Sequence, residues 1–345
     1  DNMKGMRLST KLLVAFLAVG IIPFAMMGIF SLKASSNSLS EQAFGKLQAV
    51  QNIKQQYIES YLKERIDNMQ ALSNNTIVRD AFKRLASAVM VDDGAVGGAT
   101  YQYLVETQFD STFKQFRDVY GFYDVYLITP GGKVLYSLKR ESDFGANIQE
   151  GNLKGSSLQK CFTSALNRPT IDDVSLYSPS GDKPCSFMGA PVKDEMEKLL
   201  GAVVLQLSLD AINGIMHERT GMGETGETYL VGPDKLMRSD MLYDTEHRSV
   251  LNSLKNPQEG SVDTEATRAA LNGESGRQIM TNYRGESVLA AYGPVKMGDR
   301  TWAFVAEISE KEAFATVTHT KWVMLIIGLI GLAGIIIVAF LVIRS

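Results

Sequence analysis

The residues best suited to chemistry lie in and after the segment FYDVYLITPGGKVLYSLKRESD, which begins at Phe122. Side chains alternate along a strand, so Asp124 and Tyr126 share one face, while Val125 and Leu127 share the other. The aliphatic face is expected to pack against a helix. The mixed face is expected to line a pocket, because ligand sites combine apolar walls with a few placed polar groups.

Three charged residues and two residues of a later strand are expected to complete this pocket. Lys139, Arg140 and Asp143 follow the hairpin, where the chain would curl over the cavity mouth, and Asp173 and Tyr177 share one face of the later strand. A cation could hold a ligand carboxylate and an acid could hold an amine, which suits a small zwitterion, an organic acid or another small metabolite. The alternative for the three loop charges is simple solvation, because exposure is the default for charged side chains. The predicted ligand-binding residues are Tyr126, Lys139, Arg140, Asp143, Asp173 and Tyr177.

The sequence shows no constellation typical of an enzyme. GETGE (223–227) lacks the Gly-Lys-Ser/Thr ending of a phosphate-binding loop, and Ser186 does not lie in a GxSxG motif. The three histidines are scattered, and no cysteine pair has zinc-ligand spacing. Asp172-Asp173 suggests paired carboxylates or a calcium site, but a solvated turn explains it equally well. We therefore expect a binding protein rather than an enzyme, with no metal or other cofactor.

Charge and cysteine content exclude two further classes of protein. The formal net charge of -3 offers no basic footprint for nucleic acid. Two cysteines, Cys161 and Cys185, do not make a disulfide framework; they could pair in an oxidising compartment or remain free thiols.

Two uncharged apolar segments, residues 12–32 and 322–343, are each long enough to cross a membrane as a helix. Lys4, Arg7 and Lys11 precede the first segment, so the positive-inside rule places both ends in the cytoplasm. A cleaved signal peptide is the alternative for the first segment, but its apolar stretch is longer than usual and no clear cleavage site follows. The prediction is a multi-pass protein of the inner (cytoplasmic) membrane, in contact with lipid, with residues 33–321 outside the cytoplasm.

The exterior region begins as helix and then repeats a strand-rich unit. Apolar residues at helical spacing predict one long helix that continues from the first span to Ser73, and residues 74–76 predict a break and an N-cap for a second helix over 77–85. YLITPGGKVLYS (126–137) parallels YLVGPDKLMRS (229–239), and Pro-Val-Lys recurs at 191–193 and 294–296 with the same offset. Two landmarks at one offset indicate duplication.

Each repeat is predicted to contain five antiparallel strands, with a loop-and-helix insertion after the second strand. The long helix covers one face of each sheet, and the insertion covers a cavity on the other. No Gly or Pro interrupts residues 307–321, so a rigid helical connection to the second span is expected. The predicted regions are 1–11 cytoplasmic N-terminus, 12–32 first span, 33–120 helical spine, 121–210 membrane-distal unit, 211–310 membrane-proximal unit, 311–321 connecting helix and 322–343 second span.

The segments YDVYLITPGGKVLYS with the following SDFG, and GETGETYLVGPDKLMRSD, resemble the double Cache sensor module of bacterial methyl-accepting chemotaxis proteins. The resemblance implies an α+β fold in which two PAS-like antiparallel-sheet subdomains sit on a long helical spine between two transmembrane helices. It further implies a ligand in the distal unit, a homodimer, and cytoplasmic signalling proteins that act through a region beyond Ser345. A histidine kinase or nucleotide cyclase with the same exterior region is the alternative, whereas a second span argues against a purely adhesive protein.

One departure from the family pattern bears on the ligand. Amino-acid sensors of this kind carry an Arg followed shortly by Trp-Tyr, whereas Arg140 is followed by Glu141-Ser142, which argues against an amino-acid ligand. In the second unit Tyr229 takes the place of Tyr126, and whether that pocket is used stays open.

Overall fold

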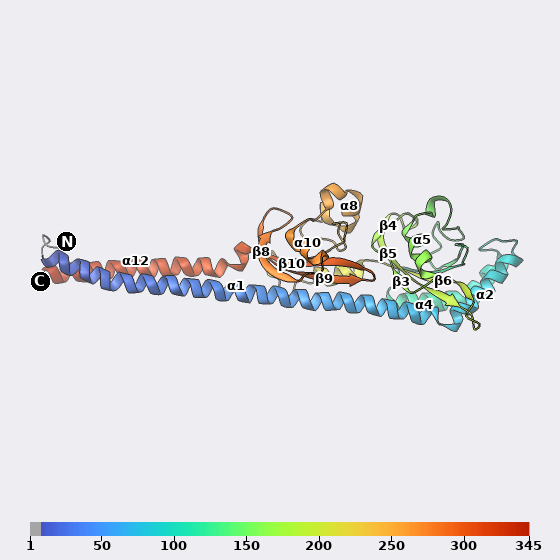
Figure 1. The fold of residues 1–345 in the computed structure, drawn as a ribbon, viewed down its shortest axis with the longest axis horizontal. Coiled ribbons are helices and arrows are strands. Elements are labelled where there is room, and N and C mark those ends of the chain that lie inside the picture. Colours follow the sequence, from blue (N-terminus) through green and yellow to red (C-terminus); the bar gives the residue numbers. More distant parts are fainter. Residues whose placement is uncertain (1–7, 345) are drawn as a thin grey trace.

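One helix runs along the length of the molecule and carries both sheets on the same side (Figure 1). The computed structural model describes residues 8–344, and helix α1 spans Leu8–Ser73 without interruption. The predicted continuity of the first apolar segment with the exterior helix is therefore confirmed. Pro23 lies inside α1, but no Gly or Pro occurs in its exterior half beyond Lys46.

Two of the described helices are long and apolar enough to cross a membrane: the N-terminal part of α1 from Ala18, and α12 (Ala315–Arg344). They lie side by side at one end of the molecule (Figure 1). Gly20 of α1 allows a close approach, because a Cβ atom there would lie 2.8 Å from Ile335 Cδ1. Small residues permit such approach between membrane helices.

Three shorter helices reverse the chain at the end of α1. Helix α2 (Thr76–Val91) is capped as predicted, since the Asn75 side chain accepts a hydrogen bond from Ile77 N. Helices α3 (Ala99–Leu104) and α4 (Asp110–Tyr120), joined by the π-helical turn η1 (Val105–Phe109), then return towards the sheets.

The distal unit contains a six-stranded sheet. Its strands are β1 (Asp124–Ile128), β2 (Val134–Ser137), β3 (Thr170–Ile171), β4 (Ser175–Tyr177), β5 (Lys183–Lys193) and β6 (Leu199–Leu207). The order is β2-β1-β6-β5-β3, with β4 paired to β5 and α5 (Ser157–Ala165) packed on the outer face. The single later strand predicted to carry Asp173 and Tyr177 is wrong, because residues 172–174 leave the ladder between β3 and β4.

The predicted division of the two faces of β1 is confirmed. Val125 and Leu127 belong to the apolar core that includes Leu62 and Met69 of α1. Tyr126 lies on the opposite face, in a smaller core with Phe162 of α5.

The proximal unit repeats this plan with a smaller sheet. Its strands are β7 (Glu227–Val231), β8 (Gly276–Thr281), β9 (Ser287–Met297) and β10 (Arg300–Ser309), in the order β7-β10-β9-β8. Helix α6 (Asp210–His217) links the two units. The outer face carries α7 (Thr245–Arg248), α8 (Val250–Lys255), α9 (Pro257–Gly260) and α10 (Glu265–Leu271) (Figure 1).

The prediction of five strands is wrong for the proximal unit, whose sheet has four. Only an isolated bridge joins Val231 to Met237. Two backbone hydrogen bonds, from Arg238 N to Leu230 O and from Gly232 N to Leu236 O, both 2.8 Å, join the two segments. Side chains accept from other main-chain groups: Leu230 N donates to Ser239 Oγ and Met237 N donates to Ser253 Oγ.

The predicted unbroken helix from β10 to the membrane is also wrong. Helix α11 (Glu310–Ala313) ends at Phe314, and α12 starts one residue later. Phe314 packs against the larger apolar core, and the Glu312 carboxylate accepts hydrogen bonds from Glu224 N and Thr225 N, both 2.7 Å. Docking of α11 on the proximal unit thus bends the connection.

Candidate functional site

Three of the six predicted site residues meet on the outer face of the distal sheet. Asp143 is fully buried, and the Tyr177 hydroxyl donates to its Oδ2 atom at 2.6 Å. The other carboxylate oxygen, Oδ1, is buried and has no hydrogen bond of normal geometry among the described residues, although the nearby Tyr126 hydroxyl acts against the burial that raises the pKa of Asp143. The Tyr126 hydroxyl donates to Gln206 Oε1 at 3.0 Å, and the rings of Tyr126 and Tyr177 both pack against Phe187. The centre of the site is therefore the buried Asp143 carboxylate, next to the rings of Tyr126, Tyr177 and Phe187.

Two further acids surround this centre. Asp124 is fully buried and accepts hydrogen bonds from Ser137 Oγ at 2.7 Å and Leu138 N at 2.9 Å. Burial raises the pKa of the Asp124 carboxyl to about 6. Glu141 accepts from Tyr123 and Ser180 hydroxyls at 2.7 and 2.6 Å.

The two predicted cations lie outside this buried group. Lys139 is exposed, with its ammonium 4.8 Å from the centre of the Tyr123 ring. The Arg140 guanidinium pairs with Asp110 of α4 at 3.0 Å, with about a third of its side chain exposed. Burial raises the pKa of the Asp143 carboxyl, as expected for an acid without a buried cation beside it. The buried part of the site thus accepts hydrogen bonds and favours positive charge.

Asp173 lies at the contact between the two units, away from Tyr126 and Asp143. Arg238 of the proximal unit holds its carboxylate through two bonds, Nε–Oδ1 at 2.8 Å and Nη2–Oδ2 at 2.9 Å. The Trp302 indole N–H donates to Oδ1 at 3.0 Å. Burial alone would raise the pKa of the Asp173 carboxyl, but the bonds and charge of Arg238 outweigh it and lower this pKa. Asp173 therefore serves as an interdomain contact in this structure.

The proximal unit has the same strand pairing as the distal unit but different side chains at the paired positions. Asp124 is the register partner of Gln206 on β6, and Glu227 is the register partner of Glu307 on β10. Tyr229 occupies the position predicted from the repeat, and its hydroxyl donates to Glu307 Oε2 at 2.9 Å. The sequence reasoning missed Glu227 and Glu307. Aligning the two repeats at Asp124 could have found Glu227.

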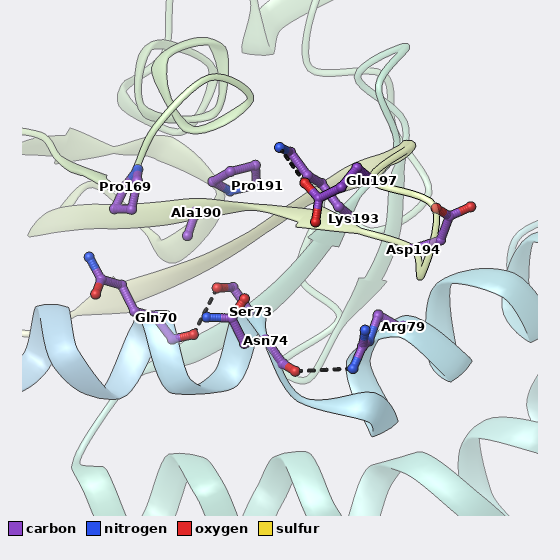
Figure 2. Close-up of a pocket in the computed structure, with 10 residues that line it drawn as sticks. All are labelled: Gln70, Ser73, Asn74, Arg79, Pro169, Ala190, Pro191, Lys193, Asp194 and Glu197. Carbon is purple, nitrogen blue, oxygen red and sulfur yellow. Dashed lines mark hydrogen bonds and ion pairs between the residues drawn. The ribbon is translucent and has the colours of Figure 1, made fainter.

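The pocket drawn in Figure 2 lies on the other side of the distal sheet. This hollow of about 400 Å³ sits between the end of α1, the start of α2 and strand β5. Ser73 and Asn74 face it from below, while Lys193 and Glu197 form their own ion pair at 2.9 Å (Figure 2). The half-buried Arg79 guanidinium donates to Asn74 O at 3.4 Å, and its buried Nε atom has no partner among the described residues. This hollow therefore offers a cation, whereas the group around Asp143 offers buried acids.

The cysteines and possible metal ligands were considered within the part of the chain that the structure describes. Cys161 on α5 and Cys185 on β5 are both buried free thiols, and burial raises the pKa of each. Within residues 8–344 no group of three or more His, Cys, Asp or Glu side chains is placed to hold a metal ion.

Comparison with known proteins identifies the family. A Cache domain model of the double type (dCache_1) matches residues 35–317. Among solved structures, the ligand-binding domain of the Campylobacter jejuni chemoreceptor Tlp3, in complex with 4-methylisoleucine, has a TM-score of 0.54 at 13% identity, covering 80% of this chain and 94% of that one. The sensor domain of the Vibrio cholerae histidine kinase DctB has a TM-score of 0.51 at 13% identity, covering 78% and 98%. No curated protein sequence matches the chain.

The likeness to these structures concerns the fold: a long helix that carries two antiparallel sheets, now bounded by two candidate membrane-spanning helices. The family match covers both sheets and most of the exterior part of α1. The chain therefore belongs to the Cache-domain family, with a double-Cache region flanked by two candidate membrane-spanning helices.

Proposed function

We propose that this protein is the sensory part of a transmembrane chemoreceptor of the inner membrane, which binds a small molecule in its distal unit and signals through α12 without catalysis. The buried Asp143 carboxylate carries this proposal. One oxygen is held by Tyr177 and the other has no hydrogen bond of normal geometry among the described residues, at a place where an unmet acceptor is costly. A ligand with N–H donors would satisfy it.

The ligand class follows from the charges of the site. Asp124 and Asp143 are buried, whereas Lys139 and Arg140 lie at the rim, so an amine would enter and a carboxylate would stay near the surface. The Tlp3 domain was solved with 4-methylisoleucine, an amino acid of this type. We propose a small primary amine or amino acid, in preference to an organic acid without a nitrogen. The buried acids are the reason to retain an amino acid, although the sequence after Arg140 lacks the Trp-Tyr of amino-acid sensors.

Transmission would use the segment that joins the site to the domain contact. Tyr177 ends β4, and Asp173 precedes the same short strand. A ligand that moves Tyr177 would pull on the Asp173–Arg238 pair and on Trp302 of β10, the strand that leads into α11 and α12. Shifts of 1–2 Å are typical at switching interfaces.

A homodimer is part of this proposal. Ile53 and Tyr57 on the exterior part of α1 are 54% and 63% exposed, on a helix whose other face already carries both sheets. A second α1 would cover them.

A histidine kinase is the second candidate, supported by the fold of the DctB sensor domain. The gene region downstream of the Ser345 codon distinguishes the two. A long helical coiled coil with methylation sites supports the chemoreceptor, and a catalytic kinase domain supports the alternative.

A thermal-shift screen of small amines, amino acids and organic acids on the full chain in detergent tests the site. Saturation to about 100 times Kd should stabilise the wild type by about 2.7 kcal/mol. Asp143→Asn and Tyr177→Phe should lose most of this shift, whereas Asp80→Asn, an exposed acid on α2, should keep it. An equal shift in all four proteins would contradict the proposed pocket.

A further inference from the structure

Two carboxylates face each other across neighbouring strands in the core of the proximal unit. Glu227 opens β7, and its register partner on β10 is Glu307. Each residue is only 3% exposed. The corresponding pair in the distal unit is Asp124 with Gln206. The proximal unit therefore has an acid, Glu307, where the distal unit has an amide.

The surrounding groups hold three of the four carboxylate oxygens. Glu307 accepts hydrogen bonds from Tyr229 Oη at 2.9 Å and Asn282 Nδ2 at 2.8 Å, and Glu227 Oε1 accepts from Tyr283 Oη at 2.8 Å. Glu227 Oε2 is buried and has no hydrogen bond of normal geometry among the described residues, although the main-chain N–H groups of Leu242 and Tyr243 act against the burial that raises the pKa of Glu227. This oxygen is therefore available to carry a proton.

The cations near the pair do not neutralise both carboxylates. Arg284, from the turn between β8 and β9, lies 3.8 Å from Glu227 Oε1 with about a third of its side chain exposed. Arg248 of α7 stacks on the Tyr283 ring and is itself paired with Asp244. Lys54 of α1 approaches β7 at Thr228, a neighbour of Glu227 on the chain, rather than at either acid.

Burial and the charge of the neighbouring acid therefore favour the protonated form. Together they raise the pKa of Glu307 to about 7, and burial raises the pKa of Glu227 as well. Because the two acids interact, the proton belongs to the pair rather than to either residue.

The same two strands hold the start of the membrane connection. Glu312 of α11 accepts hydrogen bonds from Glu224 N and Thr225 N, immediately before β7. Ser309 N, at the end of β10, donates to Thr225 Oγ1 at 3.1 Å. A change in the spacing of β7 and β10 at the acid pair thus acts a few residues away, where α11 is attached.

We propose that the Glu227–Glu307 pair is a proton-binding site, which makes the proximal unit a pH sensor acting on α12 independently of any ligand in the distal unit. With one proton bound, the two acids tolerate each other across the strands. Loss of the proton near neutral pH places two negative charges in the core, which favours an arrangement in which β7 and β10 separate. Proton affinity that differs between the two arrangements is what couples pH to the membrane helix.

Infrared difference spectra of the ligand-free full chain in lipid nanodiscs test proton binding. The carbonyl band of protonated carboxyl groups should lose a component as pH rises through about 7. Glu307→Gln places an amide at this position, as Gln206 does in the distal unit, and should remove this component. Glu259→Gln, an exposed acid on α9 of the same unit, should keep it. Burial also raises the pKa of Asp124 to about 6, so the comparison is made in an Asp124→Asn background. An unchanged component in both Glu307→Gln and Glu227→Gln would overturn the proposal.

The emission of Trp322, at the start of the apolar part of α12, tests transmission in a Trp302→Phe background. It should change with pH over the same range, and Glu312→Gln should abolish this change while the infrared component persists. A pH-independent Trp322 signal in the protein with Glu312 intact would overturn the coupling. Asp143→Asn should leave both pH signals intact, so failure of the distal site and failure of the proton site are distinguishable.

Discussion

Replacing Arg238 by methionine should destabilise the sensor through the contact between its two units. Arg238 is 2% exposed and Asp173 is 17% exposed, and the guanidinium also donates to the main-chain oxygens of Leu236 and Met237. The substitution keeps the apolar stem but leaves the Asp173 carboxylate buried, with only two neutral N–H donors, from Val174 and Trp302. Removing one partner of a buried ion pair costs about 3–5 kcal/mol.

Urea unfolding of the full chain in detergent, followed by tryptophan fluorescence, measures this effect. Asp173→Asn should also destabilise. The double variant should cost less than the sum of the two, because the unpaired charge disappears; couplings within such networks reach about 0.5–3 kcal/mol. The control is Arg168→Met, whose partner Asp299 and whose own side chain are both well exposed at the same domain contact. An Arg238→Met midpoint no lower than that of Arg168→Met would refute the reasoning.

Two further predictions concern the proximal unit. Inserting Gly-Gly after Glu312 should leave ligand-induced thermal stabilisation intact but abolish output, and a retained output would show that α11 does not carry the signal. Lys54 donates to Met216 O, Glu218 O and Thr228 Oγ1, and burial lowers the pKa of its ammonium to about 8. The folded state therefore loses this proton before the unfolded state does, so stability should rise between pH 8 and the usual lysine pKa near 10.5; Lys54→Met should remove that rise.

Local periodicity accounts for the features that the sequence predicted correctly. The apolar segment 12–32, the long helix to Ser73 and the Asn75 cap depend on residues within a few positions of each other. The division of β1 between Tyr126 and the aliphatic residues follows from strand alternation alone. The duplication was visible as two short matching phrases at one offset.

The sites depend on residues that meet only when distant strands pair. Asp173 was assigned to the distal pocket because a continuous strand would have placed it on the same face as Tyr177. Its carboxylate instead pairs with Arg238, which lies 65 positions further along the chain. No local pattern signals that partner. Likewise no Gly or Pro flanks Phe314. The helix breaks there because Phe314 and α11 pack against the core of the proximal unit.

The sequence by itself determined the helical spine, the two candidate membrane-spanning segments and the repeated strand-rich unit, because each arises from the chemistry of neighbouring residues. Only the tertiary structure decided which acids are buried, which have a cation and which face another acid, as Glu227 faces Glu307. The reason is physical: burial and charge pairing depend on the register between strands that are far apart in the chain, and the side chains of one strand do not encode that register.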